Sequence, residues 1–320
     1  MLVYIEEQVE RYDANGLLLD FSREWFCFDI LKTTSPAPIM TEFIARVREI
    51  LNRAEKKWGH PWLLHIRVMR DIAQNARLGF DIDTWYERKL VDSIGVTPRW
   101  ASCDSDMPIP LFKERFSKIP IYAGITDLTL LSPTDYETAA GYAAAYLSEG
   151  ADKICLYNFF SNPHSPSEKH TRMYCTCGAL ETLARVPRRN VVTYQDFAPL
   201  GESYFCPLPA KADGFVLPIP TGPIEEGEAV SLILGFDRLL KGKKLAVTLN
   251  GKTATLLGET ERGRAYADGK NRTSGSDTVK ALYLFTLPKG IATEKSLTVS
   301  LFSDDPTLRV SYIALELNIE

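Results

Sequence analysis

The sequence predicts an α/β region of about five parallel strands, followed by an all-β sandwich or jelly roll. Up to about residue 160, short and nearly continuous apolar runs alternate with amphipathic helical patterns, as expected for strands covered on both faces. The starts of these runs lie 46, 29, 28 and 33 residues apart, which is the spacing of βα units with right-handed crossovers. From Ala212 onward the runs alternate in polarity and turn residues separate them, without a helical pattern between them.

Five apolar segments are the predicted strands of the first region. They are Gly16–Ser22, Trp62–Val68, Val91–Thr97, Ile119–Thr126 and Asp152–Phe159. Two of the segments between them have helical periodicity. Met40–Gly59 is expected to begin at Thr41 as N-cap and to end at Gly59, and Thr134–Gly150 repeats this design.

The second region contains six strand-like runs that end in Gly, Pro, Asn-Gly or Asp-Asp turn signals. The runs are Gly214–Thr221, Ala229–Phe236, Lys244–Gly251, Ala281–Pro288, Ser296–Ser303 and Arg309–Ile319. Six or more antiparallel strands in so short a stretch indicate a sandwich or jelly roll.

These patterns divide the chain into three parts. Residues 1–165 are expected to form the α/β region, residues 166–205 a helical linker, and residues 206–320 the sandwich domain. Within the linker, Thr171–Arg185 has a helical pattern, and Pro187–Asn190 is expected to break it.

Composition excludes several classes of function. Thirty-seven basic and 41 acidic side chains give a net charge of −4, so the chain lacks the concentrated positive field that nucleic-acid or membrane-surface partners require. The apolar stretches are shorter than the roughly 18 residues of a membrane span, and the N-terminus lacks the layout of a signal peptide. We therefore expect a cytoplasmic protein with neither a nucleic-acid nor a membrane partner.

The cysteines and histidines do not form a pattern typical of metal sites. Six cysteines are too few for a disulfide scaffold, and the spacing of Cys175 and Cys177 is not that of a zinc knuckle. His164 and His170 lie six residues apart in a polar segment that we interpret as a solvated loop. No metal and no other cofactor is expected.

Carboxylates, arginines and aromatic residues collect where the predicted parallel strands end. They are Asp20, Arg23, Glu24, Trp25, Phe26, Arg67, Trp100, Asp104, Asp106, Tyr122, Asp127 and Asn158. Because the loops after parallel strands share one face of a βα barrel, these side chains are expected on a common face. Carboxylates supply acid and base for glycoside cleavage, and flat aromatic rings stack on the C–H faces of sugars. The pattern favours a carbohydrate ligand.

The order of these pieces resembles the bacterial glycosyl-hydrolase-like barrel family. The segment Asn15–Arg23, NGLLLDFSR, is similar to the family's fourth-strand pattern D-G-[IV]-x-L-D-[FW]-x-R, with Asn15 in place of the usual Asp. The strand that bears Arg67, the segment Gly79–Trp85 and the segment Gly150–Phe159 agree as well. The resemblance covers about residues 10–160.

The resemblance implies an α/β fold with a partial TIM-type (β/α) barrel of about five parallel strands, with the sandwich behind it. The five strands would correspond to strands four to eight, so we expect a C-terminal fragment of a barrel. The alternatives are strands supplied by another polypeptide or a remodelled barrel. The open side of such a sheet is expected to expose an apolar strip, or to be covered by a second copy in a homodimer or by a missing N-terminal barrel segment.

The resemblance also implies roles for the carboxylates. Asp20 would be the nucleophile of a retaining enzyme, with Asp104 or Asp106 as its partner acid. Their structural alternatives are an ion pair of Asp20 with Arg23 or Arg67, and turn capping by Asp104 and Asp106.

The remaining strand-end residues are candidates for binding the substrate. Arg23 and Arg67 would clamp a carboxylate or hydroxyl or neutralise Asp20, and Glu24 is a third carboxylate or a solvated loop charge.

Trp25, Phe26, Trp100 and Tyr122 would form stacking platforms or the rim of the core, and Asn158 would donate hydrogen bonds to a substrate. The sequence thus predicts a glycoside hydrolase-like protein that uses a carboxylate pair on an unknown carbohydrate. The alternative is a non-catalytic carbohydrate-binding protein, and a third option places the function in the sandwich.

Overall fold

A computed structural model describes residues 1–22, 26–29, 36–98, 107–127, 134–159, 167–192, 208–264, 267, 279–288 and 290–319. The described residues divide into two compact units, one drawn from residues 1–99, 108–124 and 151–155 and the other from the rest of the chain. Over these ranges, no helix has the length and the apolar character of a membrane span.

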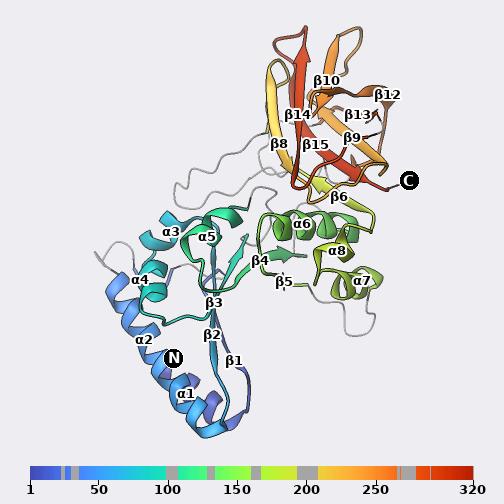
Figure 1. Ribbon diagram of the computed structural model, residues 1–320. Coiled ribbons are helices and arrows are strands. Elements are labelled where there is room, and N and C mark those ends of the chain that lie inside the picture. The colour runs from blue at the N-terminus through green and yellow to red at the C-terminus, as the bar shows by residue number, and fades with distance from the viewer. Residues whose placement is uncertain are drawn as a thin grey trace. The chain divides into compact units, whose positions relative to one another are not determined.

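The first sheet is a five-stranded parallel sheet whose strands follow one another in chain order (Figure 1). Its strands are β1 (Gly16–Asp20), β2 (Leu63–Met69), β3 (Ser93–Thr97), β4 (Ile121–Thr126) and β5 (Lys153–Tyr157). Each lies within a predicted strand or shifts from it by one residue. The sheet curls into a partial barrel, and an antiparallel β domain follows it, which confirms the predicted fold class.

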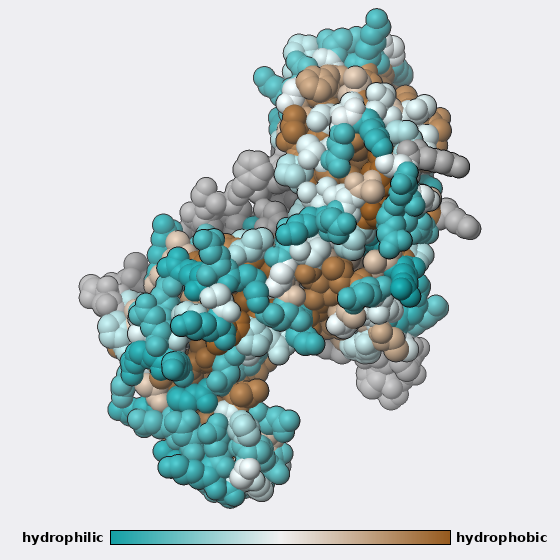
Figure 2. Space-filling view, viewed as in Figure 1, coloured by the Kyte–Doolittle hydropathy of each residue, from teal (hydrophilic) through white to brown (hydrophobic). Residues whose placement is uncertain are grey.

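Helices cover one face of this sheet in the first unit, as Figure 1 shows for α2, α3 and α4 beside strands β1–β3. The helices of this unit are α1 (Leu2–Arg11), α2 (Ala37–Trp58), α3 (Ile72–Arg77), α4 (Ile82–Glu87) and α5 (Ile109–Arg115). Leu64, Ile66 and Val68 alternate along β2 toward that face and are fully buried. The outer surface over α1 and α2 is mostly hydrophilic (Figure 2), as expected for amphipathic helices.

Helix α2 confirms one predicted cap and corrects the other. It ends at Gly59, whose φ of 79° lies in the left-handed region that favours glycine. Its N-cap is Pro36, so the prediction of Thr41 as N-cap is wrong. The helix begins earlier because Pro38 lies in its first turn, where a proline costs no hydrogen bond. Thr41 lies within the helix, and its hydroxyl accepts a hydrogen bond from Trp85 Nε1 at 2.9 Å.

The opposite face of the sheet carries Asp20, His65 and Arg67, which belong to the candidate site. Leu18 of β1 pairs with His65 of β2, and Asp20 pairs with Arg67. Leu18 and Leu63 at the start of the two strands are 51% and 50% exposed, whereas Arg67 near the end of β2 is buried. This face is therefore open and apolar where the strands begin, and polar where they end.

The second unit contains α6 (Tyr136–Ser148), α7 (Glu168–Thr176), α8 (Leu180–Leu183) and β6 (Arg188–Val191). The helical pattern ends before the Pro187–Asn190 segment, as predicted, and most of this segment forms strand β6, which the sequence did not predict. Leu315 pairs with Asn190, and Leu317 with Arg188, in an antiparallel ladder with β15. The partner strand, rather than the polar local sequence, makes this segment a strand.

Helix α6 is buried along most of its length because it packs against β6, α7 and α8. A Cβ atom at Gly141 would lie 2.1 Å from the backbone oxygen of Arg189, so only glycine permits this approach. Asn190 Nδ2 donates a hydrogen bond to the Gly141 oxygen at 3.0 Å, which ties the helix to the strand.

The β domain has two antiparallel sheets that share one hydrophobic core. Its further strands are β7 (Ala210–Lys211), β8 (Phe215–Pro220), β9 (Val230–Phe236), β10 (Leu245–Leu249), β11 (Lys252–Thr253), β12 (Thr255–Glu259), β13 (Ala281–Thr286), β14 (Ser296–Ser303) and β15 (Arg309–Leu317). The sheets have the orders β11-β10-β14-β8 and β12-β13-β9-β15-β6. Alternate residues Leu297, Val299 and Leu301 of β14 are fully buried, as in a sandwich.

A buried ionic cluster lies at the β6–β15 contact. Glu316 is 1% exposed, and its two carboxylate oxygens accept hydrogen bonds from Arg189 Nε at 2.8 Å and Arg262 Nη2 at 2.5 Å. Arg189 also donates to Asp135, the N-cap of α6, at 2.7 Å. These contacts satisfy a buried carboxylate and hold α6 on the sheet.

Candidate functional site

Asp20 lies at the carboxyl end of β1 and is held on both oxygens. Its Oδ2 accepts a hydrogen bond from Arg67 Nη2 at 2.6 Å, and its Oδ1 accepts one from the Ser22 backbone N–H at 2.9 Å. The Arg67 side chain is 2% exposed, whereas the Asp20 side chain is 33% exposed. The carboxylate thus has a fixed orientation and still reaches solvent.

The contacts around Asp20 close into a ring. Arg67 Nη1 donates to Thr97 Oγ1 at 3.0 Å, and Thr97 Oγ1 donates to Ser22 Oγ at 3.1 Å. The Ser22 backbone N–H donates to Asp20 Oδ1, and this hydrogen bond closes the ring. Because each member is fixed by the next, the ring pre-organises the carboxylate, as a functional site requires.

His65 lies on the same face, one alternation before Arg67 along β2. Its Nδ1 is 2.6 Å from Ser93 Oγ, and its ring meets the Tyr122 ring edge-on with centroids 4.8 Å apart. Desolvation by burial lowers the pKa of His65 to about 4, so the imidazole is neutral at neutral pH. A Cβ at Gly95 would lie 2.9 Å from His65 Nε2, so the glycine makes room for the ring.

Cys155 of β5 lies close enough to the Asp20–Arg67 ion pair for both charges to affect its thiol. Burial raises the pKa of its thiol, while the Arg67 charge lowers it and the Asp20 charge raises it. The thiol is free and protonated at neutral pH, which makes it a poor nucleophile.

The structure brings together only part of the predicted site. Asp20 and Arg67 form the ion pair that the sequence left open, and Tyr122 lies on the same sheet face against His65. Six predicted residues lie outside the described residues: Arg23, Glu24, Trp25, Trp100, Asp104 and Asp106. Their roles stay predictions, as does the catalytic role of Asp20.

Asn158, a predicted substrate ligand, directly follows β5 in the second unit. Its φ of 49° is in the left-handed region, which asparagine tolerates better than most residues. Its Nδ2 is buried, and no described residue accepts a hydrogen bond from it. The unused donor at the end of a strand is the observation that keeps Asn158 a candidate ligand of a substrate.

The sequence placed Asp127 at the end of a predicted strand but gave no sign of the polar cluster around it. Asp127 accepts hydrogen bonds from Lys169 Nζ and from His170 Nε2, the latter at 2.8 Å. His170 is 6% exposed in α7, so its assignment to a solvated loop is wrong. Ser167 as a typical N-cap residue, followed by Glu168 in the first turn, is the signal that could have predicted a helix start there.

This cluster anchors the start of α7 in the second unit. Ser167 Oγ meets His170 Nδ1 while it caps the helix, and the His170 ring packs edge-on against Phe159 with centroids 5.0 Å apart. Every polar atom of the histidine ring is therefore used in local contacts. Among the described residues, no three His, Cys, Asp or Glu side chains converge as metal ligands.

Comparisons with known proteins give a remote likeness only. No family model matches the chain, and no curated protein matches it. The solved structures that are similar include a glycoside hydrolase family 18 N-acetylglucosaminidase from Paenibacillus barengoltzii, at 16% identity and a TM-score of 0.27 over 40% of this chain. A beta-glucosidase from Paenibacillus barengoltzii is similar at 12% identity and a TM-score of 0.22 over 85% of this chain. The chain spans less than half of the length of these structures, 43% and 33% respectively.

Proposed function

We propose that this protein is a glycoside hydrolase-like protein that acts on a carbohydrate at the carboxyl ends of strands β1–β5. One observation supports this proposal above the others. Asp20 ends β1 as a partly exposed carboxylate, and a closed ring of hydrogen bonds through Arg67, Thr97 and Ser22 fixes its orientation. Chemistry in βα barrels takes place at this end of the strands.

The contacts of Asp20 suit a nucleophile or an electrostatic stabiliser. Arg67 and the Ser22 N–H both donate to the carboxylate, and each oxygen keeps lone-pair capacity toward the open side. An oxocarbenium-like transition state gains from a fixed negative group beneath the anomeric carbon. A proton donor would instead need its own O–H aimed at the leaving oxygen.

The proton donor in this proposal is Asp104 or Asp106, which follow β3 in the sequence and lie outside the described residues. A separation of roughly 5 Å from Asp20 would give retention, and roughly 6.5–9.5 Å would give inversion. Substrate binding is assigned to the following residues: Arg23, Glu24, Trp25, Arg67, Trp100, Tyr122 and Asn158.

A second candidate is a non-catalytic carbohydrate-binding protein. Asp20 is the one acidic residue within β1–β5, all of whose residues are described, so the sheet itself supplies no second carboxylate. Both of its oxygens also serve the ring around Arg67. A site with one carboxylate can bind a sugar, whereas the two-carboxylate mechanism needs a pair.

Hydrolysis assays on the full chain test this function. The wild type is assayed on nitrophenyl glycosides and on polysaccharides by release of reducing ends, beside Asp20→Asn and the control Glu42→Gln. Glu42 forms an exposed ion pair with Arg46 on α2, so the control removes the same charge far from β1 in sequence. Asp20→Asn should lower kcat about 10²-fold or more and leave KM nearly unchanged, whereas Glu42→Gln should behave as wild type.

Other results distinguish the alternatives. Turnover that survives in Asp20→Asn makes the catalytic assignment wrong. Oligosaccharide binding by calorimetry without any turnover by the wild type supports the binding protein instead.

A further inference from the structure

A cavity of about 610 Å³ opens in the β sandwich, within the second unit. It lies between the turn that precedes β10 and the strands β12 and β13. Its lining includes Leu240, Lys241, Lys243, Lys244, Leu256, Glu259 and Phe285. The volume falls within the roughly 300–1,000 Å³ typical of small-molecule sites.

The lining combines an apolar floor with a charged rim. Leu240 and Phe285 are buried in the sandwich core, and Leu256 on the edge strand β12 is 48% exposed. The rim carries three lysines and Glu259, which accepts a hydrogen bond from Tyr283 Oη at 3.4 Å. Such a floor suits the C–H face of a sugar ring, and the rim suits its polar groups.

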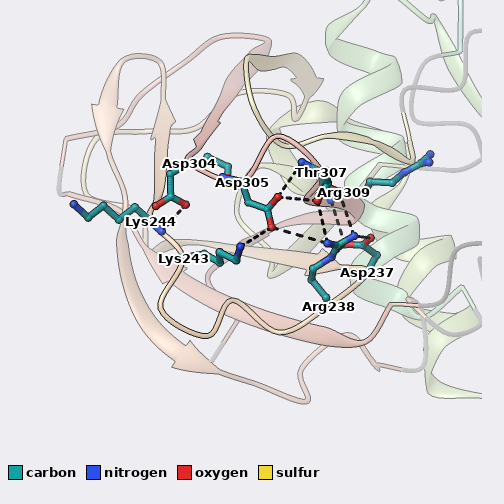
Figure 3. Close-up of polar contacts among 9 residues, drawn as sticks. Asp237, Arg238, Lys243, Lys244, Asp304, Asp305, Thr307 and Arg309 are labelled. Carbon is teal, nitrogen blue, oxygen red and sulfur yellow. Dashed lines mark hydrogen bonds and ion pairs between the residues drawn. The ribbon is translucent and has the colours of Figure 1, made fainter.

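The turn that carries the lysines, residues 240–244, is held by the segment that follows β14. Lys244 N–H donates to Asp304 Oδ1 at 3.0 Å, and Lys243 Nζ is 3.0 Å from Asp305 Oδ2. Asp305 accepts further hydrogen bonds from Thr307 N and Oγ1 at 2.9 and 2.7 Å, and Figure 3 shows these contacts. Hydrogen bonds from Thr307 and Lys243 hold the pKa of Asp305 well below its usual range.

The other end of the turn is fixed as well. Leu240 N–H donates to Tyr283 Oη at 2.9 Å, and Lys243 N–H donates to the Leu240 oxygen at 2.6 Å. Gly242 takes a φ of 70° in the turn. The turn therefore presents its side chains from a pre-organised backbone, which reduces the entropy that a ligand must overcome.

The side chains of two of the three lysines do not hold the turn. Figure 3 shows Lys243 directed at Asp305, whereas the Lys244 side chain extends away from the labelled cluster. Among the described residues, the ammonium groups of Lys241 and Lys244 form no ion pair within 4.0 Å. With Lys243 paired to Asp305, the lining carries two positive charges against the single negative charge of Glu259. The excess is one positive charge.

We infer that this cavity binds a saccharide that carries a carboxylate, such as a uronic-acid oligosaccharide. Lys241 and Lys244 pair with the carboxylate, the sugar ring lies on the floor at Leu256, and Glu259 accepts a hydrogen bond from a ring hydroxyl. The inference that the ligand is a sugar rests on the proposed function. The inference that it carries a carboxylate rests on the lining of the cavity alone.

Calorimetry on the full chain tests this inference with a galacturonic acid trisaccharide and the matching neutral galactose trisaccharide. The acidic sugar should bind, and the neutral one should bind at least about tenfold more weakly. The double variant Lys241→Ala/Lys244→Ala should lose about tenfold in affinity for the acidic sugar. The control Lys211→Ala/Lys280→Ala removes the same charge from exposed lysines outside the lining and should bind as wild type.

The remaining outcomes separate this site from the one at β1. Acidic-sugar binding that persists in Asp20→Asn supports a location in the sandwich, and its loss there overturns that location. Equal binding of both sugars, no binding at millimolar concentration, or equal losses in the two lysine variants each overturn the inference. Hydrolysis of neutral glycosides alongside any of these results would leave the proposed function intact.

Discussion

Arg67 and Asp20 share a hydrogen bond of 2.6 Å across the β1–β2 register, yet 2% of the arginine side chain and 33% of the aspartate side chain are exposed. The guanidinium is thus the desolvated partner, and the carboxylate is the one that meets solvent. A buried cation needs a compensating charge, so Asp20 stabilises the fold while it remains accessible to a ligand.

Removal of the Asp20 side chain should therefore destabilise the protein. Asp20→Ala leaves the buried Arg67 without its carboxylate, and we expect a loss of about 2 kcal/mol in the free energy of unfolding, reduced from the fully buried case by access of water. Asp20→Asn should lose less, because its amide oxygen still accepts a hydrogen bond. Urea denaturation measures both, with the exposed Glu42→Ala as a control of little effect. Equal losses in Asp20→Ala and Glu42→Ala would contradict this account.

Acid should weaken the fold through His65. Its pKa is about 4 in the folded state and about 6.5 in the unfolded state, so the unfolded state binds more protons between these values. The stabilisation from neutral His65 is complete above pH 6.5 and decreases as pH falls toward 4, by on the order of 2 kcal/mol. His65→Asn should flatten the pH dependence of the urea midpoint over this window.

His60 is the matched control for that experiment. A hydrogen bond to Asp13 raises the pKa of His60, so its contribution is present below the unfolded pKa and is lost as pH rises. His60→Asn should leave the acid-side slope due to His65 in place. An unchanged slope in His65→Asn would show that other groups cause the acid sensitivity.

A methyl group at Gly141 should disrupt the contact between α6 and β6. The added Cβ would lie 2.1 Å from the Arg189 backbone oxygen, which cannot move without distortion of the strand. Gly141→Ala should lower stability by about 3 kcal/mol, visible as a lower Tm in thermal unfolding. Gly178→Ala adds the same atom where nothing lies within 4 Å, and it should leave Tm unchanged or slightly raised.

Glu316 should be a sensitive position in the β domain. Glu316→Gln keeps the shape but removes the charge that two arginines, Arg189 and Arg262, share inside the protein. We expect a loss of about 3 kcal/mol in chemical denaturation. Glu261→Gln breaks the exposed pair with Arg264 and should have no measurable effect. If Glu316→Gln leaves the free energy of unfolding unchanged, packing rather than the ionic cluster holds α6 on the sheet.

Local pattern predicts much of this fold because strand and helix periodicity are properties of neighbouring residues. The five strands of the parallel sheet have the expected order, and Gly59 ends α2 in the expected left-handed conformation. The runs of the β domain form strands for the same reason, since alternate residues such as Leu297 and Val299 must face one core. The sequence also predicted an ion pair of Asp20 with Arg23 or Arg67 as the structural alternative to a catalytic role, and the structure contains the pair with Arg67.

Other features depend on residues that are distant in sequence. The polar residues around Asn190 predict only the end of a helix, but they form strand β6 because β15 pairs with them. His170 reads as a loop residue, but it is buried against Phe159 and hydrogen-bonded to Asp127, 43 residues earlier. The hydrogen bonds of a partner strand or a distant carboxylate carry no local signature, so periodicity cannot show them.

The sequence by itself therefore determined the α/β class, the succession of the strands and the carboxylate at the end of β1, because burial imposes its period on adjacent residues. Only the tertiary structure decided which groups hold that carboxylate. The ring from Asp20 through Arg67, Thr97 and Ser22 joins three strand ends up to 77 residues apart, and no spacing rule connects them. Parallel strands bring such residues together through the crossovers between them, so the geometry of the site exists only once the sheet has formed.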